Sequence, residues 1–124
     1  MKSSAKDPAR ERVTKICLAL PEVSCENQGT HARYLIAKKT LAYYVNNHHG
    51  NGKIAVWCKV LPGDNAALVA ANPKKFYMPE YLGPKGWVGL RLDTGDVDWE
   101  EVADLVAGSY QLIAPKRLAK NLSV

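Results

Sequence analysis

Three neighbouring segments rich in strand-forming residues, separated by short turns, constrain the fold of this chain more than any other feature. They cover residues 32–37, 40–46 and 53–60. Only Lys38 and Lys39 separate the first two segments, and the turn before the third contains glycine and asparagine, which tolerate positive φ. The sequence therefore predicts an antiparallel meander of three strands.

Alternating apolar residues in these strands predict a sheet with one buried face. Leu41, Tyr43 and Val45 fall on one face of the second strand. The third strand has apolar residues at every second position, namely Ile54, Val56, Cys58 and Val60. On this interpretation Tyr44 and Trp57 point to the opposite face, where exposed aromatic side chains would need a functional explanation.

Three helices are predicted around the sheet. The first covers residues 8–20, and it begins with Asp7 as the N-cap, followed by a proline that suits the first helical position. A shorter helix is expected to begin with Asp64 as its cap. A third begins at Asp98, which has capping-box spacing to Glu101.

Two more strands complete the predicted fold, at 76–78 and 87–92. The element order is then α-β-β-β-α-β-β-α, which predicts a two-layer α+β domain with an antiparallel sheet and helices on one face. One domain is expected over residues 1–124, with an ordered core at about 8–115 and a basic C-terminal tail at 116–124.

Length and composition are those of a globular protein. The chain has 124 residues, of which 47% are hydrophobic and 23% are charged. No apolar run is long enough to span a bilayer, and the N-terminus lacks the apolar stretch of a secretory signal, so no membrane association is expected. Three cysteines without CxxC spacing favour a reducing compartment, which predicts a cytoplasmic location.

The charge is unevenly distributed along the chain. The net charge is +5, yet six of the twelve acidic residues fall within residues 93–104. Residues 1–92 therefore carry a net charge of +8, and residues 105–124 carry +3. A basic bias of this size is compatible with a polyanionic partner, but many soluble proteins show it for solubility alone, which the charge by itself favours slightly.

An ordered set of short motifs resembles one known family. The motifs are Leu20-Pro21-Glu22-Val23, Asn72-Pro73-Lys74-Lys75-Phe76, Pro79-Glu80-Tyr81, Gly86-Trp87-Val88, and Val97-Asp98-Trp99-Glu100-Glu101 followed by Ser109-Tyr110. In this order and spacing the chain resembles the YjbR/MmcQ family over about residues 8–115. The segment Thr30-His31-Ala32-Arg33-Tyr34 departs from the family pattern, which often has an acidic or polar run and a phenylalanine ahead of the first strand.

The resemblance implies a two-layer domain and a function. Family members are described as DNA-binding by analogy with a "double wing" domain, which grips DNA with β-strands and their turns. The resemblance implies no enzymatic activity and no cofactor.

Basic turns are the candidate DNA-binding residues. Lysines in turns project into solvent and reach phosphates, giving affinity that depends on salt and is only weakly sequence-selective. The alternative is that these lysines only keep exposed turns and strand edges soluble. The candidate phosphate contacts are Lys38, Lys39, Lys74, Lys75 and Lys85, with Arg33, Lys53 and Lys59 as flanking contacts.

A second hypothesis is a protein- or peptide-interaction module, dimeric or bound to another protein, that uses the sheet face carrying Tyr44 and Trp57 or an exposed strand edge. Catalysis is not expected, because no GxSxG, HExxH, P-loop or GxGxxG motif occurs. No metal site is expected either, since His48 and His49 have no further ligand at zinc-site spacing.

Overall fold

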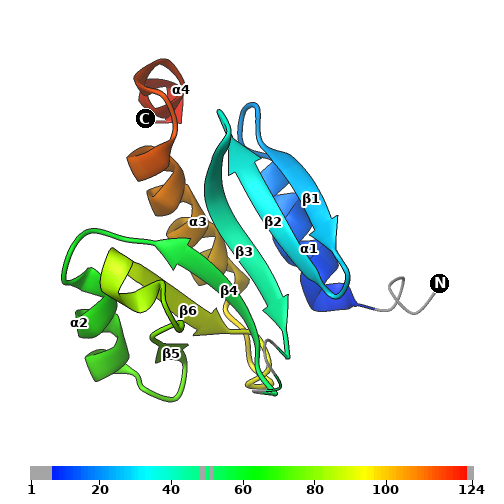
Figure 1. Ribbon diagram of the computed structural model, residues 1–124, viewed down its shortest axis with the longest axis vertical. Coiled ribbons are helices and arrows are strands. Elements are labelled where there is room, and N and C mark those ends of the chain that lie inside the picture. Colours follow the sequence, from blue (N-terminus) through cyan, green and yellow to red (C-terminus); the bar gives the residue numbers. More distant parts are fainter. Residues whose placement is uncertain (1–6, 48–49, 51, 123–124) are drawn as a thin grey trace.

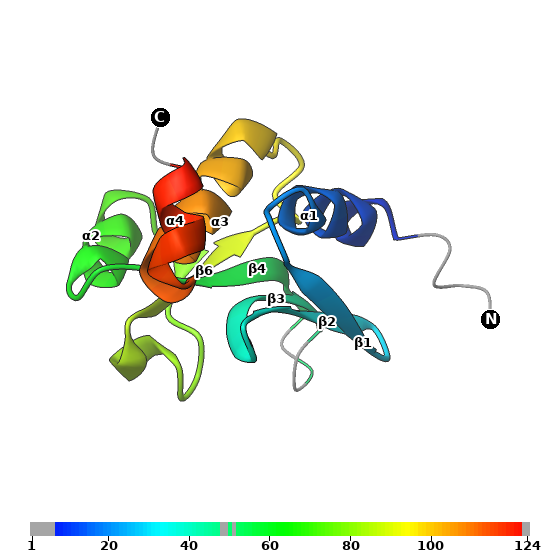
Figure 2. The same ribbon diagram turned by 90° about the horizontal axis from the view of Figure 1, so that it is seen from above.

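A six-stranded antiparallel sheet carries helices on one of its faces (Figures 1 and 2). The computed structural model describes residues 7–47, 50 and 52–122. In chain order the elements are α1 (Pro8–Leu18), β1 (Ser24–Gln28), β2 (His31–Ile36), β3 (Lys39–Asn46), β4 (Ile54–Lys59), α2 (Asp64–Ala71), β5 (Phe76–Tyr77), the 3₁₀ helix η3 (Gly83–Lys85), β6 (Trp87–Arg91), α3 (Trp99–Ile113) and α4 (Lys116–Leu122).

The strand order is β1-β2-β3-β4-β6-β5. Figure 2 shows α1 and α3 above the sheet, and the segment between β5 and β6, which includes η3, below it, on the face that carries no α-helix. The predicted α+β class, with an antiparallel sheet and helices on one face, is confirmed.

Helix starts follow the predicted capping chemistry at two of three places. The Asp7 side chain accepts a hydrogen bond from the backbone N–H of Arg10 at 3.1 Å. The Asp98 side chain accepts hydrogen bonds from the backbone N–H groups of the second and third helical residues of α3. At α2 the N-cap is Gly63, which makes no side-chain cap, and Asp64 is the first helical residue. The expectation that Asp64 caps this helix is therefore wrong.

A β-bulge in β3 reverses the alternation that the sequence suggests. Tyr34 pairs with Ala42 and Leu35 pairs with Thr40, so Leu41 is an extra residue without a partner in β2. In a bulge, two residues of one strand lie opposite a single residue of the partner strand. The side chains that follow the bulge therefore point to the other face of the sheet than simple alternation predicts. Leu41 and Tyr44 consequently belong to the same core cluster. The prediction that Leu41, Tyr43 and Val45 share a face is wrong.

Tyr44 is buried beneath α1 and has no exposed surface. Its hydroxyl group donates a hydrogen bond to the carboxylate of Asp7 at 2.8 Å, which ties the start of α1 to the sheet. Burial, together with this carboxylate, raises the pKa of the Tyr44 hydroxyl. The predicted exposure of Tyr44 is wrong because the bulge turns it toward the helices.

Trp57 lies on the face that carries no α-helix, as expected, but only 5% of it is exposed. It packs with Tyr43, Tyr77 and Trp87 in a second hydrophobic cluster, and its indole Nε1–H donates to the Tyr77 hydroxyl oxygen at 2.7 Å. The Tyr77 ring lies so close over Gly89 that a Cβ there would come within 2.6 Å of it. The predicted exposed aromatic surface of Tyr44 and Trp57 is therefore absent.

Among the described residues, one strand and one α-helix occur where the sequence patterns predicted neither, in addition to the short 3₁₀ helix η3. The edge strand β1 pairs with β2 along its whole length. The expected C-terminal tail forms α4, in which Leu118 is buried against the main core. The guanidinium group of Arg117 in α4 donates to both carboxylate oxygens of Glu22, each at 3.0 Å.

Candidate nucleic-acid interface

The antiparallel register divides the candidate basic residues between two opposite ends of the sheet. At one end, Lys39 pairs with Ile36 and Lys59 pairs with Trp87. The backbone N–H of Val60 donates to the carbonyl oxygen of Gly86, which brings η3 to the same end. We call this end the basic end and define it by four lysines: Lys38, Lys39, Lys59 and Lys85.

The other end of the sheet holds Lys53, Lys74 and Lys75, because β4 starts there and β5 follows α2 there. Two of these lysines interact within the molecule. Lys75 forms an ion pair with Glu101 at 2.5 Å, and Lys53 lies over the ring of Tyr77 at 5.3 Å from its centroid. These three residues therefore do not share a surface with the basic end.

Arg33 lies within β2, on the face that carries no α-helix, because it pairs with Tyr43. Its guanidinium group donates to the Thr40 hydroxyl oxygen at 2.7 Å and forms an ion pair with Glu26 at 3.4 Å. The sequence analysis proposed Arg33 as a flanking phosphate contact, but its charge is already paired within the sheet.

The turn between β2 and β3 presents two exposed lysines at the basic end. Its central residues Ala37 and Lys38 have φ values of 52° and 68°. Positive φ at both central residues matches the twist of a tight hairpin, although Asn-Gly is the usual sequence for it. Lys38 and Lys39 are both exposed as a result.

Helix α4 adds basic residues that sequence reasoning assigned to a tail. Figure 1 shows α4 and the β2–β3 turn at the same end of the molecule. Lys116 and Lys120 are exposed on α4, whereas the charge of Arg117 is paired with Glu22. The available signal was Leu118 and Leu122, four residues apart, after a proline that suits the start of a helix.

A cleft of about 310 Å³ opens between the end of β4, the start of α2 and η3. Lys59 and Lys85 line it together with Asn65 and several glycines and prolines, and none of the described residues that line it is acidic. The neighbouring groove between α2 and α3 differs, because Asp64 and Asp104 line it together with Lys59. Anions are thus favoured in the first of these two hollows.

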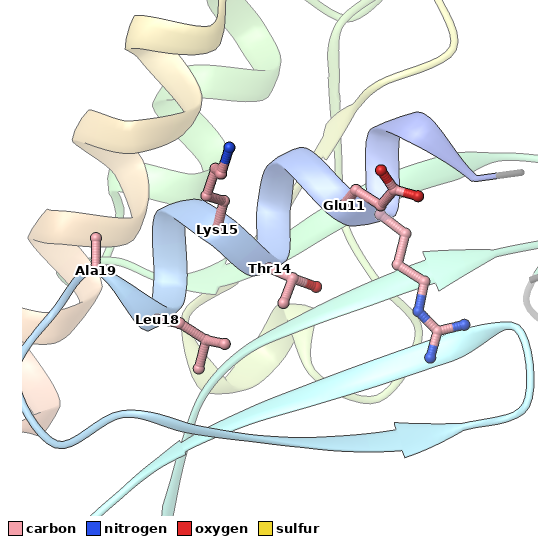
Figure 3. Close-up of a pocket in the computed structure, with 6 residues that line it drawn as sticks. Glu11, Thr14, Lys15, Leu18 and Ala19 are labelled. Carbon is pink, nitrogen blue, oxygen red and sulfur yellow. The ribbon is translucent and has the colours of Figure 1, made fainter. Parts of the chain in front are cut away.

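A larger and shallower hollow, of about 600 Å³, lies beside α1 (Figure 3). Lys15 points away from the strands there, whereas Thr14 and Leu18 point toward them. The Thr14 hydroxyl group is hydrogen-bonded to the Tyr34 hydroxyl group at 2.7 Å, and Arg10 donates to the carbonyl oxygen of Gly29 at 2.8 Å. These contacts join α1 to the strands beneath it.

The buried thiols are not suited to nucleophilic chemistry. Burial raises the pKa of Cys17 to about 12 and raises the pKa of Cys58 well above its usual value. Both thiols are therefore protonated at neutral pH, and both belong to the hydrophobic core.

Within the described residues, no group of three or more histidine, cysteine or acidic side chains is placed to hold a metal ion. His48 and His49, which the sequence analysis considered as ligands, lie outside the described residues. The helices that the structure describes include none with the length and apolar character needed to span a membrane.

Comparison with known proteins places the chain in one family. Among solved structures, the crystal structure of protein DR2400 of Deinococcus radiodurans, which carries a DUF419 domain, superposes with a TM-score of 0.68. The two sequences are 22% identical, and the match covers 93% of this chain and 88% of DR2400. No match was found among curated proteins. The YjbR family model matches residues 18–112, well over half of the sequence, and the chain therefore belongs to the YjbR family.

Proposed function

We propose that this chain is a non-catalytic DNA-binding domain that contacts backbone phosphates through the basic end. The observation that carries the proposal is the gathering of Lys38, Lys39, Lys59 and Lys85 at one end of the sheet. No ion pair among the described residues involves any of these four lysines. Their charges are therefore available to a polyanion.

Binding of this kind is electrostatic and weakly sequence-selective. Lysines that reach phosphates release counterions and set affinity, but they read no base sequence. The exposed Lys116 and Lys120 of α4 extend the positive surface beyond the β-turns that the sequence analysis proposed. The proposal includes a cytoplasmic location, because a reducing compartment suits three free thiols.

A second candidate function is association with a protein or with a second copy of the chain. The aromatic sheet face is buried, but the groove between α2 and α3 has two exposed leucines on its walls. Leu61 is 54% exposed and Leu112 is 44% exposed, and both line this groove of about 300 Å³. Exposed apolar side chains in one groove are typical of interaction sites.

Two charge-matched double variants test the DNA-binding proposal. The first, Lys38→Gly with Lys85→Gln, removes two charges from the basic end. The second, Lys15→Gln with Lys74→Gln, removes two exposed charges from elsewhere. Both variants have the same net charge, so only the position of the lost charges differs.

Fluorescence anisotropy of a labelled duplex, titrated between 50 and 200 mM salt, distinguishes the two variants. We expect the first variant to reduce the salt slope by about two, because each phosphate contact contributes roughly 0.9 to it. The second variant should retain the wild-type slope. Equal losses in both variants would show that only net charge matters and would contradict a defined site.

A further inference from the structure

Tyr81 is an exposed aromatic residue on a strained backbone. It is 77% exposed and has a φ of 65°. The backbone N–H of Leu82 donates to the carbonyl oxygen of Glu80 at 2.7 Å, which makes Tyr81 the central residue of a three-residue turn. A γ-turn with positive φ at its centre is the rare and strained form.

The fold itself does not explain a tyrosine at this position. Glycine adopts positive φ without strain, whereas a side chain with a Cβ resists it. Among the described residues, the Tyr81 ring makes no hydrogen bond and no contact with another ring or a cation. The backbone strain at Tyr81 is therefore not offset by packing of its side chain. Such uncompensated strain often marks a functional position.

The turn is held firmly in place by its neighbours. Leu82 packs against the second hydrophobic cluster, and its carbonyl oxygen accepts from the backbone N–H groups of Lys85 at 3.0 Å and Trp87 at 3.2 Å. The backbone N–H of Gly83 donates to the carbonyl oxygen of Pro79 at 2.8 Å. The ring therefore projects from a firmly held backbone turn, which belongs to the segment that Figure 2 shows below the sheet.

The lysine-lined cleft lies close to the turn that carries Tyr81, because Gly83 and Lys85 follow Tyr81 in the chain and both line the cleft. Gly83, which lines the cleft, is two residues from Tyr81, a Cα separation of about 7 Å at most. Lys85 follows two residues later, and Lys59 reaches the same cleft from β4. An aromatic ring beside a cation-lined groove is the combination that binds single strands, in which the base stacks and the phosphate pairs with a cation.

We infer that Tyr81 stacks on an unpaired base of single-stranded DNA, while the adjoining phosphate lies in the cleft between Lys59 and Lys85. The inference rests on the proposed DNA-binding function and adds a ligand class to it. Bases inside a duplex are already stacked on one another, so the ring has no face to contact there. Duplex DNA is therefore bound by the basic end alone, whereas Tyr81 increases the affinity only for single-stranded DNA.

The test compares variants of Tyr81 on labelled single-stranded and duplex DNA of equal length, by fluorescence anisotropy at one salt concentration. Tyr81→Ala should weaken single-strand binding roughly 5- to 150-fold, the range that loss of one stacked base gives. Its duplex affinity should stay within about twofold, because phosphate contacts are unchanged. Tyr81→Phe should retain single-strand binding, since it keeps the ring.

Two controls separate a loss of stacking from a loss of folding. Tyr81→Gly removes both the ring and the backbone strain, so it should raise the melting temperature and still weaken single-strand binding. Met78→Ala shortens another exposed apolar side chain of the same segment and should leave DNA binding unchanged.

The two proposals fail in different ways. If the wild type binds DNA and Tyr81→Ala binds single strands equally well, the stacking inference is overturned and the basic end stands. If Met78→Ala weakens binding as much as Tyr81→Ala, the segment acts through its shape and the inference is again overturned. If the wild type binds neither form of DNA at low salt, the proposed function itself is wrong.

Discussion

Lys38 and Tyr81 both occupy backbone conformations that glycine adopts more easily, at φ values of 68° and 65°. Both side chains are exposed, so neither offsets its strain by packing. Each is a central residue of a tight turn, and its side chain is exposed to solvent. At the scale of single residues, a strained backbone with an exposed side chain favours a role in binding for Lys38 and Tyr81 over a role in stabilising the fold.

Replacement of Lys38 by glycine should raise the free energy of unfolding. Relief of the left-handed conformation contributes about 1–2 kcal/mol, which the greater freedom of glycine in the unfolded chain offsets by roughly 0.4–1 kcal/mol. We expect a net gain of up to about 1.6 kcal/mol in urea unfolding. Lys39→Gly is the control, because Lys39 lies in β3, where glycine should cost about 0.5–1 kcal/mol. Destabilisation by Lys38→Gly would contradict the assigned turn geometry.

Helix α4 and the bulge in β3 show what the sequence could predict at the scale of elements. Alternation and capping residues located α1, α3 and the meander because each pattern lies within its own segment. The bulge at Leu41 depends on the partner strand, so alternation along β3 alone placed Tyr44 on the wrong face. Residues Ser24–Gln28 are polar, and they form β1 because they pair with β2. Local strand propensity alone does not predict this strand.

Helix α4 should contribute to stability through Leu118, which is buried against the main core. Leu118→Ala should lower the free energy of unfolding by about 2–3 kcal/mol, through lost burial and an unfilled cavity. Leu112→Ala truncates an exposed leucine of α3 and should cost less than about 1 kcal/mol. Equal effects in chemical denaturation would indicate that α4 does not pack as described.

At the scale of the whole molecule, the arrangement of the strands determines which charged side chains lie close together. Lys59 and Lys85 are 26 positions apart in the sequence, yet β4 and β6 bring them to one cleft. Lys74 and Lys75 belong to a family motif but lie at the opposite end of the sheet. Sequence reasoning identified the basic residues but not their grouping, because the grouping depends on strand register, and it missed α4 by treating that segment as a tail.

The central claim is that the basic end binds DNA by phosphate contacts, and the most direct test is the salt dependence of wild-type binding to labelled duplex. With two to four phosphate contacts, affinity should fall roughly tenfold to a hundredfold between 50 and 200 mM salt. Absence of binding at 50 mM salt, or an affinity that salt leaves unchanged, would contradict the account.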